Sequence, residues 1–195
     1  MRKVILQEFV TVDGFAAGPD GSTEFISATT KADSRIDRDL LRFIDTIGTV
    51  LLGANTYRLF AGYWPDATTD TEIVADALNA TPKIVFSRTL GRAPWGEWEE
   101  ARVVEGDAAA EVEAMKRGPG NDMVVWGSLS LARSLMEKAV IDEYQLFVCP
   151  VRLGAGERLF PDDAATEHLS LIDATTYESG AVLLRYRPAE AAADR

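Results

Sequence analysis

The feature that most constrains the fold is the alternation of short apolar runs with longer amphipathic segments along the chain. The apolar runs are rich in β-branched residues and predict buried strands. They cover residues 3–10, 49–52, 83–87, 122–126 and 143–150, with a shorter run at 103–104. The segments between them repeat apolar residues every three or four positions and predict helices. These helices cover residues 33–47, 55–60, 69–79, 107–117 and 128–138.

Strands that alternate with helices form a largely parallel sheet with helices on both of its faces. Near the C-terminus, two alternating runs at residues 169–177 and 181–187 flank Ser179-Gly180 and predict an antiparallel hairpin at one edge. The sequence therefore predicts an α/β fold of three layers. We expect one domain over residues 1–188 and a frayed tail over 189–195.

Composition excludes several classes of protein. The chain has 195 residues, of which 47% are hydrophobic, so it is not disordered. Its net charge of −11 disfavours partners that are nucleic acids or anionic membranes. No stretch has the length of a membrane span or the pattern of a signal peptide, which predicts a cytoplasmic protein. One cysteine, Cys149, and one histidine, His168, offer no disulfide, no metal site and no Ser-His-Asp triad.

Three turns that follow predicted strands have the composition of an anion-binding site. Two of them lead into helices, whose N-termini attract phosphate, and the third is polar and basic. The candidate residues are Gly53, Asn55 and Thr56 in the first turn, Ser87, Arg88 and Thr89 in the second, and Gly127, Ser128 and Leu129 in the third. A glycine at such a junction is also ordinary turn chemistry. Together, the three turns favour a nucleotide cofactor.

Two further segments are candidates for a substrate pocket. The glycine-containing loop over residues 11–22 begins with Val12, Asp13, Gly14 and Phe15, and long loops of this kind are often functional. Tyr63-Trp64 is an aromatic pair beside the first turn. It forms either the wall of a pocket for a flat heterocycle or part of the ordinary packing.

The order of these motifs resembles the dihydrofolate reductase-like superfamily. The resemblance is closest to the C-terminal reductase domain of the bacterial bifunctional riboflavin deaminase-reductase and its stand-alone relatives. The matching segments are Val12-Asp13-Gly14-Phe15, Leu51-Leu52-Gly53-x-x-Thr56-Tyr57, residues 83–87, Gly127-Ser128-x-x-Leu131-Ala132, residues 141–144, and Pro150-Val151-x-Leu153-Gly154-Ala155-Gly156-x-x-Leu159-Phe160. They span nearly the whole chain in the order of the family.

The resemblance implies a cytoplasmic, NADPH-dependent reductase of riboflavin biosynthesis or a related pathway. Its substrate would be a pteridine-like or aminopyrimidine heterocycle, as in a 5-amino-6-(5-phosphoribosylamino)uracil reductase. The three turns would hold the dinucleotide, with Ser87 and Arg88 on the adenosine 2′-phosphate and Gly127 and Ser128 toward the pyrophosphate and nicotinamide. The segment Val12–Phe15 and the pair Tyr63-Trp64 would line the substrate pocket. Relatives often form homodimers, which we also expect here.

Two departures from the family pattern leave a second function open. Relatives commonly carry Arg after the glycine of the first turn, where this chain has Ala54, and Gly-Gly at the third turn, where it has Trp126-Gly127. The alternative is therefore a catalytically inactive ligand-binding or regulatory module on the same fold. No catalytic residue is assigned, because Asp37 and Asp39 are acids in a suitable region that no motif fixes. An α/β hydrolase is disfavoured by the absence of a G-x-S-x-G motif.

Overall fold

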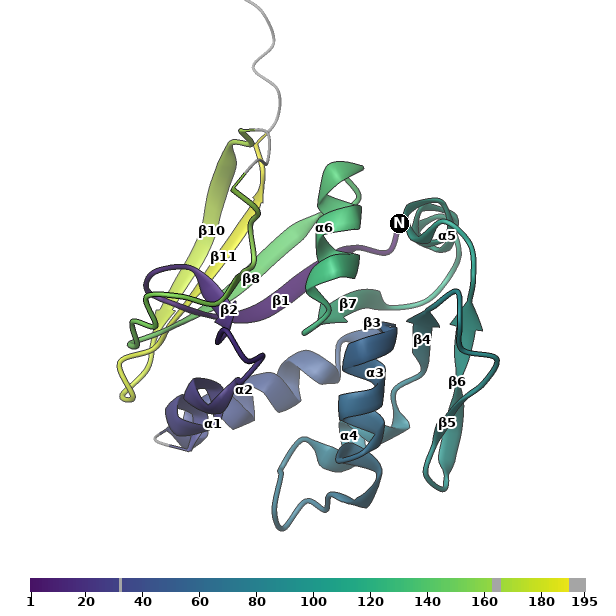
Figure 1. Cartoon of the computed structure of the whole chain (residues 1–195), viewed down its shortest axis with the longest axis horizontal. Helices are drawn as coiled ribbons and strands as arrows, with labels where there is room; N and C mark the ends of the chain where they lie inside the picture. The colour runs from purple at the N-terminus through teal and green to yellow at the C-terminus, as the bar shows by residue number, and fades with distance from the viewer. Residues whose placement is uncertain (32, 163–165, 190–195) are drawn as a thin grey trace, which may run out of the picture.

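In a computed structural model, which describes residues 1–31, 33–162 and 166–189, a nine-stranded sheet organises the chain (Figure 1). The strand order is β10-β11-β8-β1-β7-β3-β4-β6-β5. The parallel strands are β1 (Val4–Thr11), β3 (Ile47–Gly53), β4 (Lys83–Phe86), β6 (Trp98–Val104), β7 (Asp122–Trp126) and β8 (Glu143–Cys149). The expected parallel sheet is thus confirmed.

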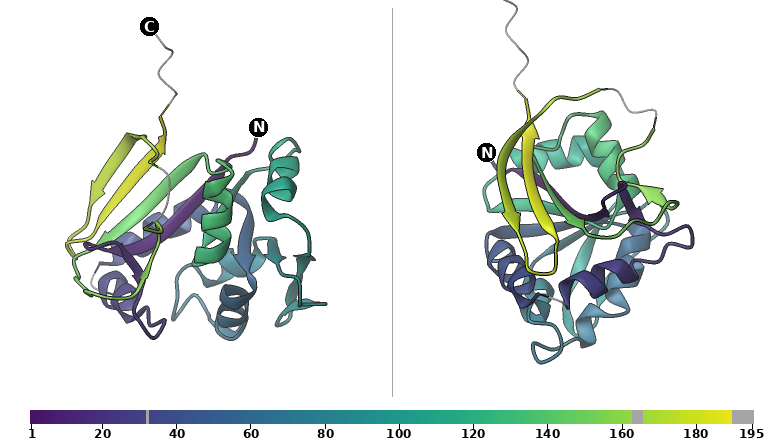
Figure 2. Two further views of the ribbon diagram at one scale, coloured as in Figure 1. Left: turned by 45° about the horizontal axis from the view of Figure 1, so that its top comes forward. Right: turned by 90° about the vertical axis from the view of Figure 1, so that its left-hand side faces the viewer.

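Antiparallel strands close both edges of this sheet. The hairpin of β10 (Leu169–Thr176) and β11 (Val182–Pro188) pairs with β8, which confirms the predicted C-terminal hairpin. Figure 2 shows this hairpin in yellow at one edge. At the other edge, β5 (Ala93–Trp95) pairs with β6, in a segment to which the sequence patterns assign no strand. The predicted two-residue strand at 103–104 is the end of the longer β6.

Helices cover both faces of the sheet. On one side lie α1 (Glu24–Thr30), α2 (Ser34–Ile44), α3 (Ala54–Ala61) and α4 (Ala75–Ala80), with the short 3₁₀ helix η1 (Trp64–Asp66). On the other side lie α5 (Ala108–Lys116) and α6 (Leu129–Glu137). The three-layer α/β arrangement around a mostly parallel sheet is therefore as predicted.

The order in which the chain visits the strands explains the two layers of helices. From β1 the chain steps to β3, β4 and β6, and then reverses to place β7 between β1 and β3 and β8 beyond β1. Because crossovers between parallel strands are right-handed, a reversal of direction moves the connecting helices to the opposite face. The connection that follows β7 therefore runs over one face of the sheet, and the connections that follow its neighbours β1 and β3 run over the other face. Ligands bind at such a switch point.

The core has one apolar layer on each face of the sheet. Val125 packs with Leu135 of α6 in one layer, and Val124 packs with Leu78 of α4 in the other. Neighbouring residues of β7 thus point to opposite layers, as the two-residue period of a strand requires. Among the described residues, every helix is too short or too polar to cross a membrane.

Three local predictions are corrected by the structure. The expected loop over residues 11–22 contains β2 (Phe15–Ala17), which pairs with β9 (Glu157–Arg158) in a separate two-stranded sheet. The helix predicted over 69–79 is only Ala75–Ala80, because the threonines, the aspartate and the other β-branched residues before it are poor helix formers. Helix α1 was not predicted, because its Ser and Thr residues are unfavourable inside helices. The burial of Phe25 in the folded protein supports the helix nevertheless.

Of the predicted tail, residues 190–195 lie outside the described part of the chain, and the N–H of Ala189 donates to the carbonyl of His168. His168 is exposed just before β10, and Cys149 is buried at the end of β8.

Candidate functional site

A cleft of about 1640 Å³ opens where the parallel strands end and the chain turns into helices. Its floor is formed by Gln7, Glu8 and Phe9 of β1 and by the turns that follow β3 and β7. Residues from α1 and α2 form one wall, and residues from α6 contribute to the other. The cleft therefore lies at the switch point of the sheet, which the strand order marks as the place for a ligand.

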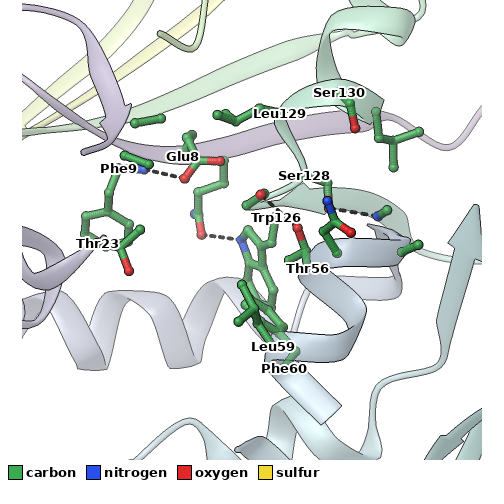
Figure 3. A pocket seen from close by; sticks show the side chains of 18 of the residues that line it. Glu8, Phe9, Thr23, Thr56, Leu59, Phe60, Trp126, Ser128, Leu129 and Ser130 are labelled. Atoms are coloured by element: carbon green, nitrogen blue, oxygen red, sulfur yellow. Dashed lines mark hydrogen bonds between the residues drawn. The ribbon is translucent and has the colours of Figure 1, made fainter. Parts of the chain in front are cut away.

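Two hydrogen bonds fasten the turn after β3 to the turn after β7. The N–H of Gly53 donates to Oγ of Ser128 at 2.8 Å, and Oγ1 of Thr56 donates to the carbonyl of Gly127 at 2.9 Å. Figure 3 shows Thr56 and Ser128 in this position. Gly127 has φ +57°, and a Cβ atom there would approach Cγ2 of Thr56 to 3.2 Å. The close approach of the two turns thus depends on glycine at position 127.

Helices α3 and α6, which start at these two hydrogen-bonded turns, begin differently from α2 and α5, although α1 and α4 also lack a side-chain cap. Asp33 and Asp107 cap the N-termini of α2 and α5 by accepting backbone N–H groups. Helices α3 and α6 have no side-chain cap, because Gly53 has no side chain and Ser128 uses its hydroxyl on Gly53. The first N–H groups of two neighbouring helices are thus left for a ligand, and both helix dipoles favour an anion there.

The second turn, over Ser87, Arg88 and Thr89, lies beside the first because β4 pairs with β3, with Phe86 opposite Gly53. Oγ of Ser87 accepts the N–H groups of Thr89 and Leu90 at 3.2 and 3.1 Å, which closes a tight polar turn. Arg88 is exposed on the cleft and forms no ion pair with the described residues. A free guanidinium above a hydroxyl-rich turn suits a phosphate group.

The structure brings most of the predicted site residues to this one cleft. The cleft is lined by Gly53, Asn55, Thr56, Tyr63, Trp64, Ser87, Arg88, Thr89, Gly127, Ser128 and Leu129. The four residues Val12, Asp13, Gly14 and Phe15 do not line it, and Ala16 and Ala17 lie there instead. These four residues lie outside the lining of the cleft, and their part in substrate binding stays a prediction.

Asp13 has a structural setting that explains this difference. Its carboxylate accepts the hydroxyl of Thr11 at 2.6 Å and the N–H groups of Leu153 and Gly154 at 3.2 and 2.7 Å. The hydroxyl of Thr11 is the main cause that lowers the pKa of Asp13 to about 2. Asp13 therefore fastens the loop after β1 to the loop after β8 rather than facing the cleft.

Trp126 and Ala54, the two departures from the family pattern, both lie on the cleft. Nε1 of Trp126 donates to Oε1 of Gln7 at 2.8 Å, and its ring packs at an angle on Phe43, 6.4 Å between ring centres. The half-buried indole is thus held in place as part of the cleft wall beside Gly127.

The two candidate acids are in different surroundings. Asp37 lines the cleft, and its pKa is raised by burial and by the nearby charge of Glu72. Asp39 accepts hydrogen bonds from Arg42 at 2.9 Å and from the hydroxyl of Tyr177 at 3.1 Å. Asp39 is thus engaged in packing α2 against the C-terminal strands, which leaves Asp37 as the only one of the two on the cleft.

Glu8 is a cleft residue that sequence reasoning did not select. Its side chain is only 6% exposed, Oε1 accepts the N–H of Phe9 at 3.2 Å, and Oε2 has no partner among the described residues. Burial raises the pKa of Glu8 to about 7, against the opposing effect of the N–H groups of Phe9 and Gly127. The available signal was a single acid inside the apolar run of residues 3–10.

Comparison with known proteins identifies the family. The model of the RibD C-terminal domain matches residues 2–183. The chain belongs to the RibD C-terminal domain family. Proteins of this family share the riboflavin-pathway reductase-like fold, and the family is one of oxidoreductases.

Individual relatives agree with this assignment. The chain is 29% identical over 188 residues to the uncharacterized protein YyaP of Bacillus subtilis, which covers 95% of this chain and 94% of that protein. A solved structure from Shewanella sp. PV-4, provisionally assigned to riboflavin biosynthesis, superposes with a TM-score of 0.74 at 17% identity, over 96% of this chain and 99% of that one. The Thermotoga maritima diaminohydroxyphosphoribosylaminopyrimidine deaminase/5-amino-6-(5-phosphoribosylamino)uracil reductase superposes with a TM-score of 0.64 at 15% identity, over 96% of this chain and 57% of that one. These two structures share the fold of this RibD C-terminal domain.

Proposed function

We propose that this RibD C-terminal domain is an NADPH-dependent reductase that transfers a hydride to a pteridine-like or aminopyrimidine heterocycle. The observation that carries the proposal is the pair of uncapped helix N-termini, fastened together by Ser128 and Thr56 at the switch point of the sheet. A dinucleotide needs such backbone donors for its phosphates.

The residues of the cleft fit this cofactor. The first turns of α3 and α6 would bind the pyrophosphate through backbone N–H groups, which compensates for Ala54 in place of a cation. Ser87, Arg88 and Thr89 would bind the 2′-phosphate, the only group that distinguishes NADPH from NADH. The molecule has a net charge of −11, so binding of this anion depends on these local donors rather than on the overall field.

Binding would divide the cleft into two parts. When bound, the reduced nicotinamide supplies the hydride, and the chain's own residues orient the reactants and exclude water. The opposite part of the cleft is open to a flat heterocycle between the side of α2 and the aromatic residues Phe60, Trp64 and Trp126. Apolar and aromatic walls of this kind suit a pteridine or pyrimidine ring.

The alternative of an inactive ligand-binding module remains a second proposal, because Ala54 and Trp126, the two departures from the family pattern, both line the cleft. It predicts ligand binding without oxidation of NADPH in the presence of any reducible pterin or pyrimidine. Turnover with one such heterocycle would exclude it. The homodimer and the cytoplasmic location stay predictions. Light scattering is the test of the homodimer, and the exposed Leu171 and Ile172 on edge strand β10 are compatible with it.

Titration with NADPH and NADH, followed by fluorescence, tests the proposed function. Because a charge-assisted phosphate contact is lost, Arg88→Ala should weaken NADPH binding about tenfold or more. Its effect on NADH should be small. Arg92→Ala is the matched control, since Arg92 lies in the same loop but pairs with Glu100. Absence of NADPH binding at millimolar concentration, or equal losses for both nucleotides, would contradict the proposal.

A further inference from the structure

Glu8 occupies a position in β1 where the fold otherwise places apolar side chains. Residues 4, 6 and 10 of the same strand point into the apolar layer beneath α6, and Glu8 belongs to the same row. Its partner in the register is Leu146 of β8, which is also part of that layer. A carboxyl group in such a position costs free energy unless the group is neutral or paired. Its presence is not explained by packing.

The buried carboxyl has an unused hydrogen-bonding site at the cleft. Oε1 accepts the N–H of Phe9, while Oε2 is buried without any partner among the described residues. In Figure 3, Glu8 lies between Phe9 and Trp126, the last residue of β7, and on the side of Leu129, the first residue of α6. Buried polar atoms in native proteins are normally satisfied, so an orphan oxygen on a residue that lines a cleft points to a bound ligand or a proton.

The surrounding charged groups do not supply a partner. The charged side chains of the cleft on the elements around Glu8 are Glu24 of α1, Asp37 of α2, Arg133 of α6 and Glu157 of β9. Arg133 donates to the backbone carbonyls of Arg158 and Leu159. No described ion pair includes Glu8. A group with this environment holds a proton near neutral pH, in agreement with its raised pKa of about 7.

We propose that Glu8 is the acid–base group of the cleft, which binds a ring nitrogen of the heterocycle through Oε2 and donates a proton to it. This inference rests on the proposed function. Reduction of a C=N bond adds a hydride to carbon and a proton to nitrogen, so the π bond breaks and one C–H and one N–H bond form. Glu8 supplies the proton only, is left as a carboxylate, and recovers a proton from water when the product leaves. Position and pKa both suit this task, since a general acid works best when its pKa is near the working pH.

Infrared difference spectroscopy tests this role without turnover. Wild-type protein titrated from pH 5 to 9 should show the C=O band of one protonated carboxyl that disappears with a midpoint near pH 7. Glu8→Gln should lack this band, and Asp37→Asn, which removes the other acid with a raised pKa on the cleft, should retain it. A wild-type protein without the band, or a band that survives in E8Q and is lost in D37N, would overturn the proposal.

The second arm examines contact with the heterocycle and uses 7,8-dihydropterin as the probe, with NADP⁺ present so that no reduction occurs. When the probe binds, the Glu8 band should shift or disappear, because its proton is shared with a ring nitrogen. A bound probe that leaves the band unchanged would overturn the proposal, and so would failure of the wild-type protein to bind the probe. NADPH binding, measured separately, reports on the proposed function. E8Q should retain that binding whichever result the probe gives.

Discussion

Two buried glutamates on neighbouring strands show how differently the two ends of the parallel strands are built, the amino end and the carboxyl end at the cleft. Glu143 begins β8 at the amino edge of the parallel strands and is 2% exposed, and Glu8 lies toward the cleft in β1 and is 6% exposed. Glu143 accepts hydrogen bonds from Arg185 at 2.7 Å and from Gln145 at 2.8 Å, with Lys3 at 3.6 Å. Glu8 accepts one backbone hydrogen bond within the distance criterion, from the N–H of Phe9 at 3.2 Å, and its Oε2 has no partner among the described residues. The N–H of Gly127 acts on the carboxyl only as a weaker influence that opposes the rise of its pKa.

The pKa values follow from these surroundings. Burial disfavours the ionised form of both carboxyls, but the hydrogen bonds and charges around Glu143 outweigh it and lower that pKa. At Glu8 burial dominates and raises the pKa to about 7. At the same amino edge, Lys116 and Asp142 also form a close pair, 2.8 Å apart. Buried charges at the amino end of the parallel strands are thus paired, which stabilises the fold. At the carboxyl end, hydrogen-bond donors and acceptors are left available to a ligand.

The largest effect is expected when the ion pair between Glu143 and Arg185 at the amino end of the strands is removed. Glu143→Gln leaves Arg185 without its counter-charge, and we expect the free energy of unfolding to fall by about 2–3 kcal/mol, since Arg185 is partly exposed. Urea denaturation measures this loss. Glu113→Gln is the matched control, because its pair with Arg117 lies on the surface and should contribute less than about 1 kcal/mol. Equal effects of the two variants would remove the contrast.

A second prediction concerns Glu8 and the sign with which it makes the free energy of unfolding depend on pH. Glu8 ionises near its ordinary value of 4.5 in the unfolded chain and at about 7 in the folded one. The folded protein thus holds an extra proton between these values, and stability is lost as the pH rises through this window. Glu8→Gln should therefore leave stability unchanged below pH 4.5 and raise it by about 2–3 kcal/mol above pH 7.

Thermal or urea unfolding at several pH values measures this effect. Glu24→Gln, which removes an exposed carboxylate from the lining of the same cleft, serves as the control for the loss of one negative charge. If E8Q destabilises the protein equally at every pH, Glu8 is a structural residue and the distinction between the two glutamates fails.

The smallest effect is expected at the hydrogen bond between Gly53 and Ser128, which joins the turn after β3 to the turn after β7. Ser128→Ala removes the hydroxyl that accepts the N–H of Gly53, so the free energy of unfolding should fall by about 1 kcal/mol. Ser134→Ala on the same helix is the control, because its hydroxyl donates only to the local carbonyl of Leu131. Weaker NADPH binding by S128A than by S134A would show that the hydrogen bond between Gly53 and Ser128 supports the cofactor site. Equal NADPH binding by the two variants would show that it does not.

Much of the fold was predictable from local patterns. The buried strands and the main helices are encoded by hydrophobic periodicity, which depends only on neighbouring residues. The turns at Gly53, Ser87 and Gly127 were predictable for the same reason, and the sheet brings all three to one cleft. The helix α1 and the strands β2, β5 and β9 were not predictable, because short elements of weak propensity depend on partners distant in sequence.

The sequence by itself therefore determined the order of strands and helices, the family and the composition of the anion-binding turns. Only the tertiary structure decided which acids face the cleft. Asp13 is held by loop residues 140 positions away, and Asp39 is engaged by Tyr177, while Glu8 is left without a charge partner. The physical reason is that the pKa and the availability of a carboxyl depend on burial and on partners that distant segments supply, which the local sequence does not specify.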